Sequence, residues 1–169
     1  MASDPRNPSS AASPLFLREA EIRRGIELLF FGHAELMRSG DDILAAHELG
    51  RAHHRALYFI ARKPGLAVGE LMTLLGVTKQ SLGRTLGDLE TRGLISRHKG
   101  QRDRRQVLIR LTPSGEALEG ELFAAFREKM IAAYRDAGPG AVTGFWAVLE
   151  QLLTEDMRDR AADLSRRGG

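Results

Sequence analysis

The sequence predicts a fold that is mainly α with a small β-hairpin wing. Three observations lead to this prediction. Apolar residues recur at helical spacing through most of the chain after residue 15. Two helical segments meet at a tight turn near residue 76, and two short aliphatic runs at 94–97 and 107–111 enclose a polar connection, as in a β-hairpin. With 169 residues, the chain is long enough for one domain with extensions.

Composition excludes several classes of protein. The chain has no cysteine, which removes disulfides, cysteine-based zinc and iron–sulfur sites and thiol chemistry. No apolar run reaches the roughly 18 residues that span a bilayer, and a secretory signal pattern is missing at the start. We therefore expect a cytoplasmic protein with no membrane partner. Because no nucleophile–base spacing or phosphate loop occurs, we expect no enzyme, no catalytic residue and no cofactor.

The N-terminal part of the chain divides in two. Residues 1–14 are rich in serine and proline and predict a disordered tail. Residues 15–38 predict an amphipathic helix that a break at 39–42 ends, so that 15–47 forms an N-terminal dimerisation helix and linker. Its apolar stripe comprises Ile22, Ile26, Leu29, Phe30, His33, Leu36 and Met37.

Residues 48–111 predict a central domain that contains the tight turn and the hairpin. A helix at 48–62 is expected to bury Leu49, His53, Ala56, Leu57 and Ile60 and to end at Pro64-Gly65. A short helix at 68–75 ends at Gly76, and Thr78 is a good N-cap for a helix at 79–92, which Gly93 stops. The hairpin follows.

Residues 112–169 predict the C-terminal dimerisation helices. Thr112-Pro113 is a helix start, and that helix ends at Gly138-Pro139-Gly140. A last helix is expected at 141–164. The apolar stripes of the three long helices exceed what the small central core can cover, so we expect a two-fold homodimer.

The helix-turn-helix spacing places chemistry on the second helix. Leu82, Leu86 and Leu89 share one face, so the other side carries Gln80, Arg84, Gly87, Asp88 and Thr91, flanked by Lys79 and Ser81. Gln and Arg side chains can pair with adenine and guanine in the major groove. By itself, this pattern is equally typical of a solvated helix face.

The hairpin tip favours nucleic acid. One acid, Asp103, stands among the basic residues Arg97, His98, Lys99, Arg102, Arg104 and Arg105. Phosphates supply the anions that such a loop lacks, although a solvated basic loop is the alternative. Residues 78–110 carry a net charge of +6, whereas the rest of the chain carries −3.

Residues 64–115 resemble the MarR family of bacterial winged-helix regulators. The resemblance rests on PGLAVGELMTLLGVTKQSLGRTL, LETRGLISR and DRRQVLIRLTPSG, and GRAHHRALYFIARKPGL is similar to a PetP-like subgroup. It implies that residues 48–111 form a winged helix-turn-helix DNA-binding domain, flanked by long dimerisation helices that intertwine with those of a second copy. It also implies binding to a pseudo-palindromic operator in double-stranded DNA.

The resemblance also implies the residues that contact DNA. On the recognition helix they are Thr78, Lys79, Gln80, Ser81 and Arg84. On the wing, Arg105 is expected to enter the minor groove, with Asp103 orienting it through an ion pair and with Arg102 and Arg104 on phosphates. Gly83 and Gly87 depart from the family pattern, in which serine or a larger polar residue is more common at these positions. Each glycine weakens the helix by about 0.5–1 kcal/mol relative to alanine.

In the family, a small anionic or aromatic effector binds between the dimer helices and the DNA-binding lobe. By position, its expected pocket comprises His33, Arg51, His54, Arg55 and Tyr58; Arg55 is equally consistent with a surface residue. The leading hypothesis is a repressor that such an effector releases from DNA. Two alternatives stay open, a winged-helix protein-interaction module and a metal-responsive regulator. The latter would use His33, His47 and His53 or His54 across chains, with Glu48; no metal ligand is assigned.

Overall fold

The computed structural model describes residues 17–100 and 105–167, so the predicted tail at 1–14 lies outside it. The chain divides into two units, residues 1–36 and 37–169, which are described separately. The described elements are α1 (Glu19–Arg38), α2 (Asp41–Ala46), α3 (Arg51–Arg62), β1 (Leu66–Ala67), α4 (Val68–Leu75), α5 (Lys79–Thr91), β2 (Ile95–Lys99), β3 (Val107–Leu111), α6 (Pro113–Ala137), α7 (Pro139–Leu152) and α8 (Glu155–Arg167). No helix in the described ranges is both long and apolar enough to cross a membrane.

The described part of the first unit consists largely of α1. Glu19 and Glu21 occupy its first turn, where carboxylates stabilise the positive end of the helix dipole. Arg23 adds an ion pair to Glu19 at 2.7 Å, one turn away. The predicted helix is confirmed, but none of its residues is buried: Phe30 and Phe31 are 71% and 67% exposed.

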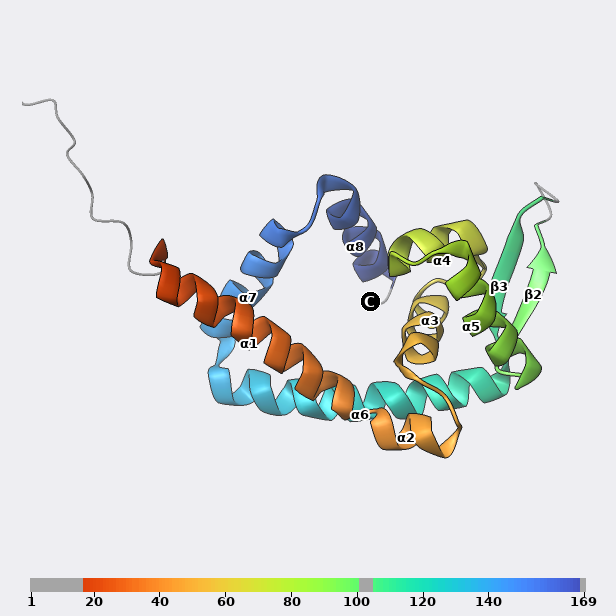
Figure 1. Cartoon of the computed structure of the whole chain (residues 1–169), viewed down its shortest axis with the longest axis horizontal. Helices are drawn as coiled ribbons and strands as arrows, with labels where there is room; N and C mark the ends of the chain where they lie inside the picture. Colours follow the sequence, from red (N-terminus) through yellow and green to blue (C-terminus); the bar gives the residue numbers. More distant parts are fainter. Residues whose placement is uncertain (1–16, 101–104, 168–169) are drawn as a thin grey trace, which may run out of the picture. The chain divides into compact units, whose positions relative to one another are not determined.

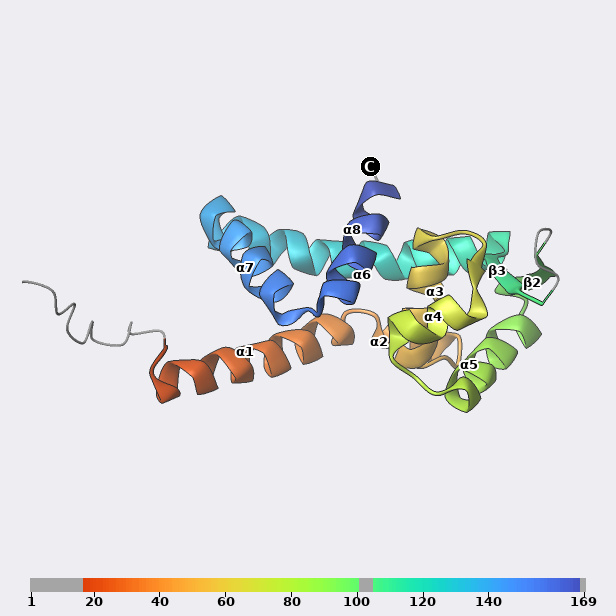
Figure 2. The same cartoon turned by 90° about the horizontal axis from the view of Figure 1, so that it is seen from above.

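The second unit is built around one apolar core. The helices α3, α4 and α5 surround it on one side, and α6 begins beside the sheet and then extends well beyond the core (Figures 1 and 2). Its largest fully buried side chains are Leu57, Ile60, Leu66, Leu71, Leu82, Leu86, Leu89, Ile109 and Leu122. These aliphatic residues come from α3, β1, α4, α5, β3 and α6, so one core joins the helices of the helix-turn-helix to the sheet and to α6.

The sheet has three antiparallel strands in the order β1-β3-β2. The predicted hairpin is confirmed: Ile95 pairs with Leu111 and Lys99 with Val107. The sequence pattern does not predict β1, whose Leu66 pairs with Ile109, because a two-residue strand is too short to show alternation.

Two predicted boundaries before the core are wrong. The segment predicted as a linker contains α2, in which Asp41 and Asp42 favour the helix N-terminus and Leu44 is 2% exposed. The next helix begins at Arg51 rather than at residue 48, because Glu48 has φ +53° and Gly50 is extended. The buried histidine of α3 is His54, whereas His53 is only partly covered.

The prediction of a single last helix at 141–164 is also wrong, because two helices, α7 and α8, occupy this part of the chain. Leu153 takes an extended conformation after α7. The Thr154 hydroxyl oxygen then accepts the Met157 N–H at 3.4 Å, which starts α8. An N-cap threonine in the middle of an apolar pattern therefore redirects the chain.

The junction between hairpin and α6 explains the LTPSG motif. The Thr112 hydroxyl oxygen accepts the Gly115 N–H at 3.1 Å, and the hydroxyl donates to the Gly93 carbonyl at 2.6 Å. The Thr112 N–H donates to the Leu94 carbonyl at 3.0 Å. Gly115 is buried against the same carbonyl, so the start of α6 lies directly on the start of the wing.

We expect Gly115→Ala to destabilise the fold. An added Cβ would lie 1.9 Å from the Leu94 carbonyl oxygen, and backbone cannot yield as a flexible side chain does. The free energy of unfolding should fall by about 3 kcal/mol, measured by urea denaturation. Gly120→Ala on the same helix is the control: its Cβ meets nothing within 4 Å, and stability should rise by about 0.5–1 kcal/mol. Equal midpoints for the two variants would contradict the close approach.

Candidate nucleic-acid interface

The turn between α4 and α5 is set by its glycine and threonine, as predicted. Gly76 has φ +64°, and its N–H donates to the Met72 carbonyl at 3.0 Å, which closes α4. Two residues later, the Thr78 hydroxyl oxygen accepts the Ser81 N–H at 3.3 Å and starts α5. The turn thereby fixes the direction in which α5 leaves.

The recognition helix α5 has one buried and one exposed face. Leu82, Leu86 and Leu89 are 2%, 1% and 0% exposed, and Thr85, also buried, donates its hydroxyl to the Ser81 carbonyl at 3.2 Å. All five residues that the sequence predicts as the DNA-contacting set of this helix are exposed: Thr78, Lys79, Gln80, Ser81 and Arg84. The arrangement gathers two cations and three neutral hydrogen-bonding side chains near the N-terminus of one helix.

Gly83 and Gly87 leave the surface of α5 open. A Cβ at either position would meet nothing within 4 Å. Neither glycine is therefore required by packing within the described residues, and nothing in the fold explains their presence.

The wing is tied to the recognition helix by an ion pair. Arg97 Nε on β2 lies 3.1 Å from Glu90 Oε2 on α5. Further out, the Gly100 N–H donates to the Gln106 carbonyl at 2.9 Å and closes the hairpin. The tip residues Arg102, Asp103 and Arg104 lie outside the described residues, whereas Arg105 is exposed at the end of the hairpin.

The predicted effector residues have different surroundings. Arg51 makes a two-pronged bond to the carboxylate of Asp41 at 2.9 and 2.6 Å, and Arg55 donates to the Leu75 carbonyl at 3.0 Å. Tyr58 is half-buried. His33, on α1, is exposed and belongs to the other unit.

His54 is buried at the boundary of α3 and α6. Its ring stacks on Phe126, with centroids 4.4 Å apart and planes 17° from parallel. Among the described residues, no hydrogen-bond partner reaches its buried Nδ1. Burial lowers the pKa of this imidazole below its usual value.

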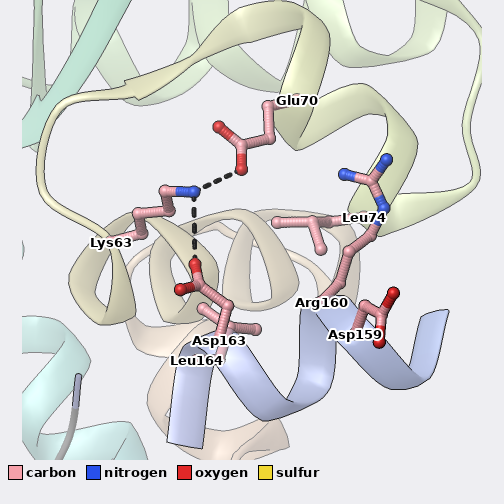
Figure 3. Close-up of a pocket in the computed structure, with 7 residues that line it drawn as sticks. All are labelled: Lys63, Glu70, Leu74, Asp159, Arg160, Asp163 and Leu164. Carbon is pink, nitrogen blue, oxygen red and sulfur yellow. Dashed lines mark hydrogen bonds and ion pairs between the residues drawn. The ribbon is translucent and has the colours of Figure 1, made fainter. Parts of the chain in front are cut away.

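A cavity of about 200 Å³ lies elsewhere, between α3, α4 and α8 (Figure 3). Its two cations already face carboxylates: Lys63 lies 2.5 Å from Glu70 and 3.5 Å from Asp163, and Arg160 lies 2.8 Å from Asp156. An anionic ligand would have to displace these carboxylates, and none of the predicted effector residues lines the cavity.

The described histidines do not form a metal centre within one chain. In residues 17–100 and 105–167, no three histidine, aspartate or glutamate side chains lie close enough to hold an ion. Both nitrogens of His53 already have partners: Nδ1 accepts the Gly50 N–H, and Nε2 lies 3.3 Å from Asp88 Oδ2.

Comparison with known proteins agrees with this geometry. The model of the MarR family matches residues 47–106. The chain is 49% identical to the HTH-type transcriptional regulator PetP of Rhodobacter capsulatus over 85% of this chain and 87% of the relative. This identity agrees with the PetP-like subgroup that the sequence around α3 indicates.

Solved structures share the fold. A MarR family regulator from Silicibacter pomeroyi superposes with a TM-score of 0.66 at 25% identity, covering 79% of this chain and 89% of that one. A MepR variant of S. aureus, solved bound to an oligodeoxyribonucleotide, superposes with a TM-score of 0.53 at 21% identity, covering 75% and 93%. The mainly helical winged helix-turn-helix fold is thus confirmed.

We expect acid to destabilise the protein through His54. As pH falls, this histidine takes up a proton more readily in the unfolded chain than in the folded protein, because burial lowers its pKa in the folded state. The unfolded state then binds more protons, and the free energy of unfolding falls. His54→Leu should reduce the loss of stability between pH 7 and pH 5 in urea titrations, whereas the exposed control His98→Gln should retain it. An unchanged loss in His54→Leu would contradict this assignment.

Proposed function

The chain belongs to the MarR family of winged helix-turn-helix transcriptional regulators, a family of regulators rather than enzymes, and we propose that it is a homodimeric repressor of this type. It binds a pseudo-palindromic operator in double-stranded DNA and responds to a small-molecule effector. The observation that carries the proposal is the exposed polar face of α5 beside a basic wing.

The proposed DNA contacts follow from this face. Lys79, Gln80 and Arg84 enter the major groove, where Arg pairs with guanine and Gln with adenine, while Thr78 and Ser81 contact phosphates or bases. The wing follows the adjacent minor groove, whose negative potential favours arginine, with Arg105 as the inserted residue. Arg102 and Arg104 lie on phosphates, and Asp103 orients Arg105. A MepR variant of S. aureus that shares the fold was solved bound to an oligodeoxyribonucleotide, which supports DNA as the partner of this chain.

The homodimer is proposed from exposed apolar surface. On α1, Leu28, Phe30 and Phe31 are each at least 60% exposed, and on α7 the same holds for Val148 and Leu152. So much aliphatic and aromatic surface is unusual for a monomer. Covering it with a second copy gives two recognition helices related by a two-fold axis, and such a dimer reads a palindrome.

The effector is proposed to act through α3. Arg55 holds the carbonyl of Leu75, the last residue of α4. A small anionic or aromatic compound that bound this guanidinium would break its hydrogen bond to the end of α4, the helix that precedes the recognition helix. His54 and Tyr58, on the same helix, offer the aromatic surroundings that such a compound fits. Release of DNA on binding makes the protein a repressor that its effector inactivates.

We expect sequence-specific DNA binding by the full chain. Fragments selected from genomic DNA should contain a palindrome, bound at least roughly 10³-fold more tightly than scrambled DNA in fluorescence anisotropy.

Two variants test the proposed contacts. Arg84→Ala should weaken the free energy of binding by about 1–3 kcal/mol and relax specificity at one position of each half-site. Arg105→Ala should weaken binding and lower the salt dependence. Arg127→Ala, an exposed arginine on α6, is the control. Equal affinity for palindromic and scrambled DNA would contradict sequence-specific binding and favour the protein-interaction module.

We also expect α1 to hold the dimer. Phe30→Asp places a carboxylate on the apolar face and should lower the mass in sedimentation equilibrium from two chains to one, because burying an unpaired charge costs several kcal/mol. Arg24→Asp introduces the same residue on α1 at a position that is already polar and should leave the dimer intact. A monomeric wild-type chain at micromolar concentration would overturn the homodimer.

A further inference from the structure

Two side-chain contacts connect the N-terminal end of α3 with the C-terminal end of the recognition helix α5. One starts in the first turn of α3 and the other in the segment before it. His53 Nε2 lies 3.3 Å from Asp88 Oδ2, and Arg92 Nη1 lies 3.3 Å from Glu48 Oε2. The four side chains are called the α5 clasp below. His53 and Asp88 are 35 residues apart in the sequence, and Glu48 and Arg92 are 44 residues apart. Each pair therefore comes together only in the folded chain.

The histidine contact has a defined tautomer. The Gly50 N–H donates to His53 Nδ1 at 3.0 Å, so Nδ1 carries a lone pair. A neutral imidazole then has its proton on Nε2, the atom that faces Asp88. His53 therefore caps the start of α3 with one nitrogen and donates to α5 with the other.

The arginine contact uses an unusual backbone conformation. Glu48 has φ +53°, the only positive φ among the described residues other than glycine. Next to it, the His47 carbonyl accepts from Arg92 Nη1 at 3.0 Å, and the Glu48 carboxylate binds the same guanidinium. A left-handed conformation is unfavourable for a residue with a side chain, and here it places the Glu48 carboxylate and the His47 carbonyl on the same guanidinium.

Core packing alone does not fix the rotation of α5 about its own axis, whereas the bonds of the α5 clasp do. Burial of Leu82, Leu86 and Leu89 holds the helix on the core, but apolar contact has no preferred direction and tolerates small rotations about the helix axis. Hydrogen bonds are directional. Asp88 lies one turn after Arg84, so a bond that fixes Asp88 also fixes the direction in which Arg84 projects.

We propose that His53 and Glu48 are positioning residues that set the rotation of the recognition helix for base readout. This inference rests on the proposed function, because it concerns how α5 meets DNA. The clasp contributes little to overall stability, because the Asp88 side chain is 62% exposed and solvent screens an ion pair this exposed.

Three variants separate positioning from capping and from charge. His53→Gln keeps both functions, because its amide oxygen can accept the Gly50 N–H while its NH₂ donates to Asp88. His53→Glu keeps the cap at the third residue of α3 but removes the donor and repels Asp88. Ala52→Glu, at an exposed neighbouring position, adds the same charge without touching the clasp.

The first measurement needs no DNA. Amide hydrogen exchange of the full chain should be several-fold faster in residues 86–92 of His53→Glu than in wild type, His53→Gln or Ala52→Glu. In wild type, the imidazole ¹⁵N shifts should report the Nε2–H tautomer. Unchanged exchange in His53→Glu, or the Nδ1–H tautomer, overturns the clasp whether or not the protein binds DNA.

The second measurement uses the selected palindrome. His53→Glu should lose roughly three- to tenfold in affinity for the palindrome and much less for scrambled DNA, with His53→Gln near wild type. An equal loss on both DNAs, matched by Ala52→Glu, means that charge alone acts and overturns positioning. Specific binding absent from wild type refutes the proposed function, while the exchange data still decide the clasp.

Discussion

The burial of one face of α5 is the constraint on which the reading surface depends. A helix of 13 residues packed against a core can bury only one stripe, and Leu82, Leu86 and Leu89 take it. Every other side chain of the helix is then placed by geometry. The polar residues near its N-terminus face outward for this reason, and the capped turn at Thr78 sets where they begin. Function here follows from which residues the core leaves outside.

The junction at Leu94, Thr112 and Gly115 transmits that placement to the long helix. The Leu94 carbonyl accepts the Thr112 N–H, and the absent side chain of Gly115 lets α6 start against the same carbonyl. The wing and α6 therefore share one backbone contact. In the proposed two-fold dimer, held by α1 and the C-terminal helices, the separation of the two recognition helices would depend on how rigid this contact is. A glycine at the third position of α6, otherwise a poor helix residue, is the consequence.

Local signals in the sequence predict most of the central elements, and their failures share a cause. Thr78, Gly76 and Thr112 act through neighbours within a few residues, so their effects can be derived from spacing alone. The strand β1 and the helix α2 depend on partners far along the chain: β1 exists because Ile109 pairs with Leu66, and α2 because Leu44 enters the core. The exposed face of α5 is predictable for the same local reason. The bonds of His53 and Arg92 span dozens of residues and leave no pattern in spacing.

The centre of these long-range bonds is the start of α3. Three consecutive residues contact three different helices: His53 bonds to Asp88 on α5, His54 stacks on Phe126 of α6, and Arg55 holds the end of α4. Successive side chains of a helix diverge by about 100°, so three in a row are the shortest run that can reach three neighbours around it. A small rotation of α3 strains all three contacts together. A compound bound at Arg55 would therefore disturb the contact of His53 with α5 and the contact of His54 with α6 at the same time. The rotation of α3 would then be the link between the compound and the DNA-contacting helix.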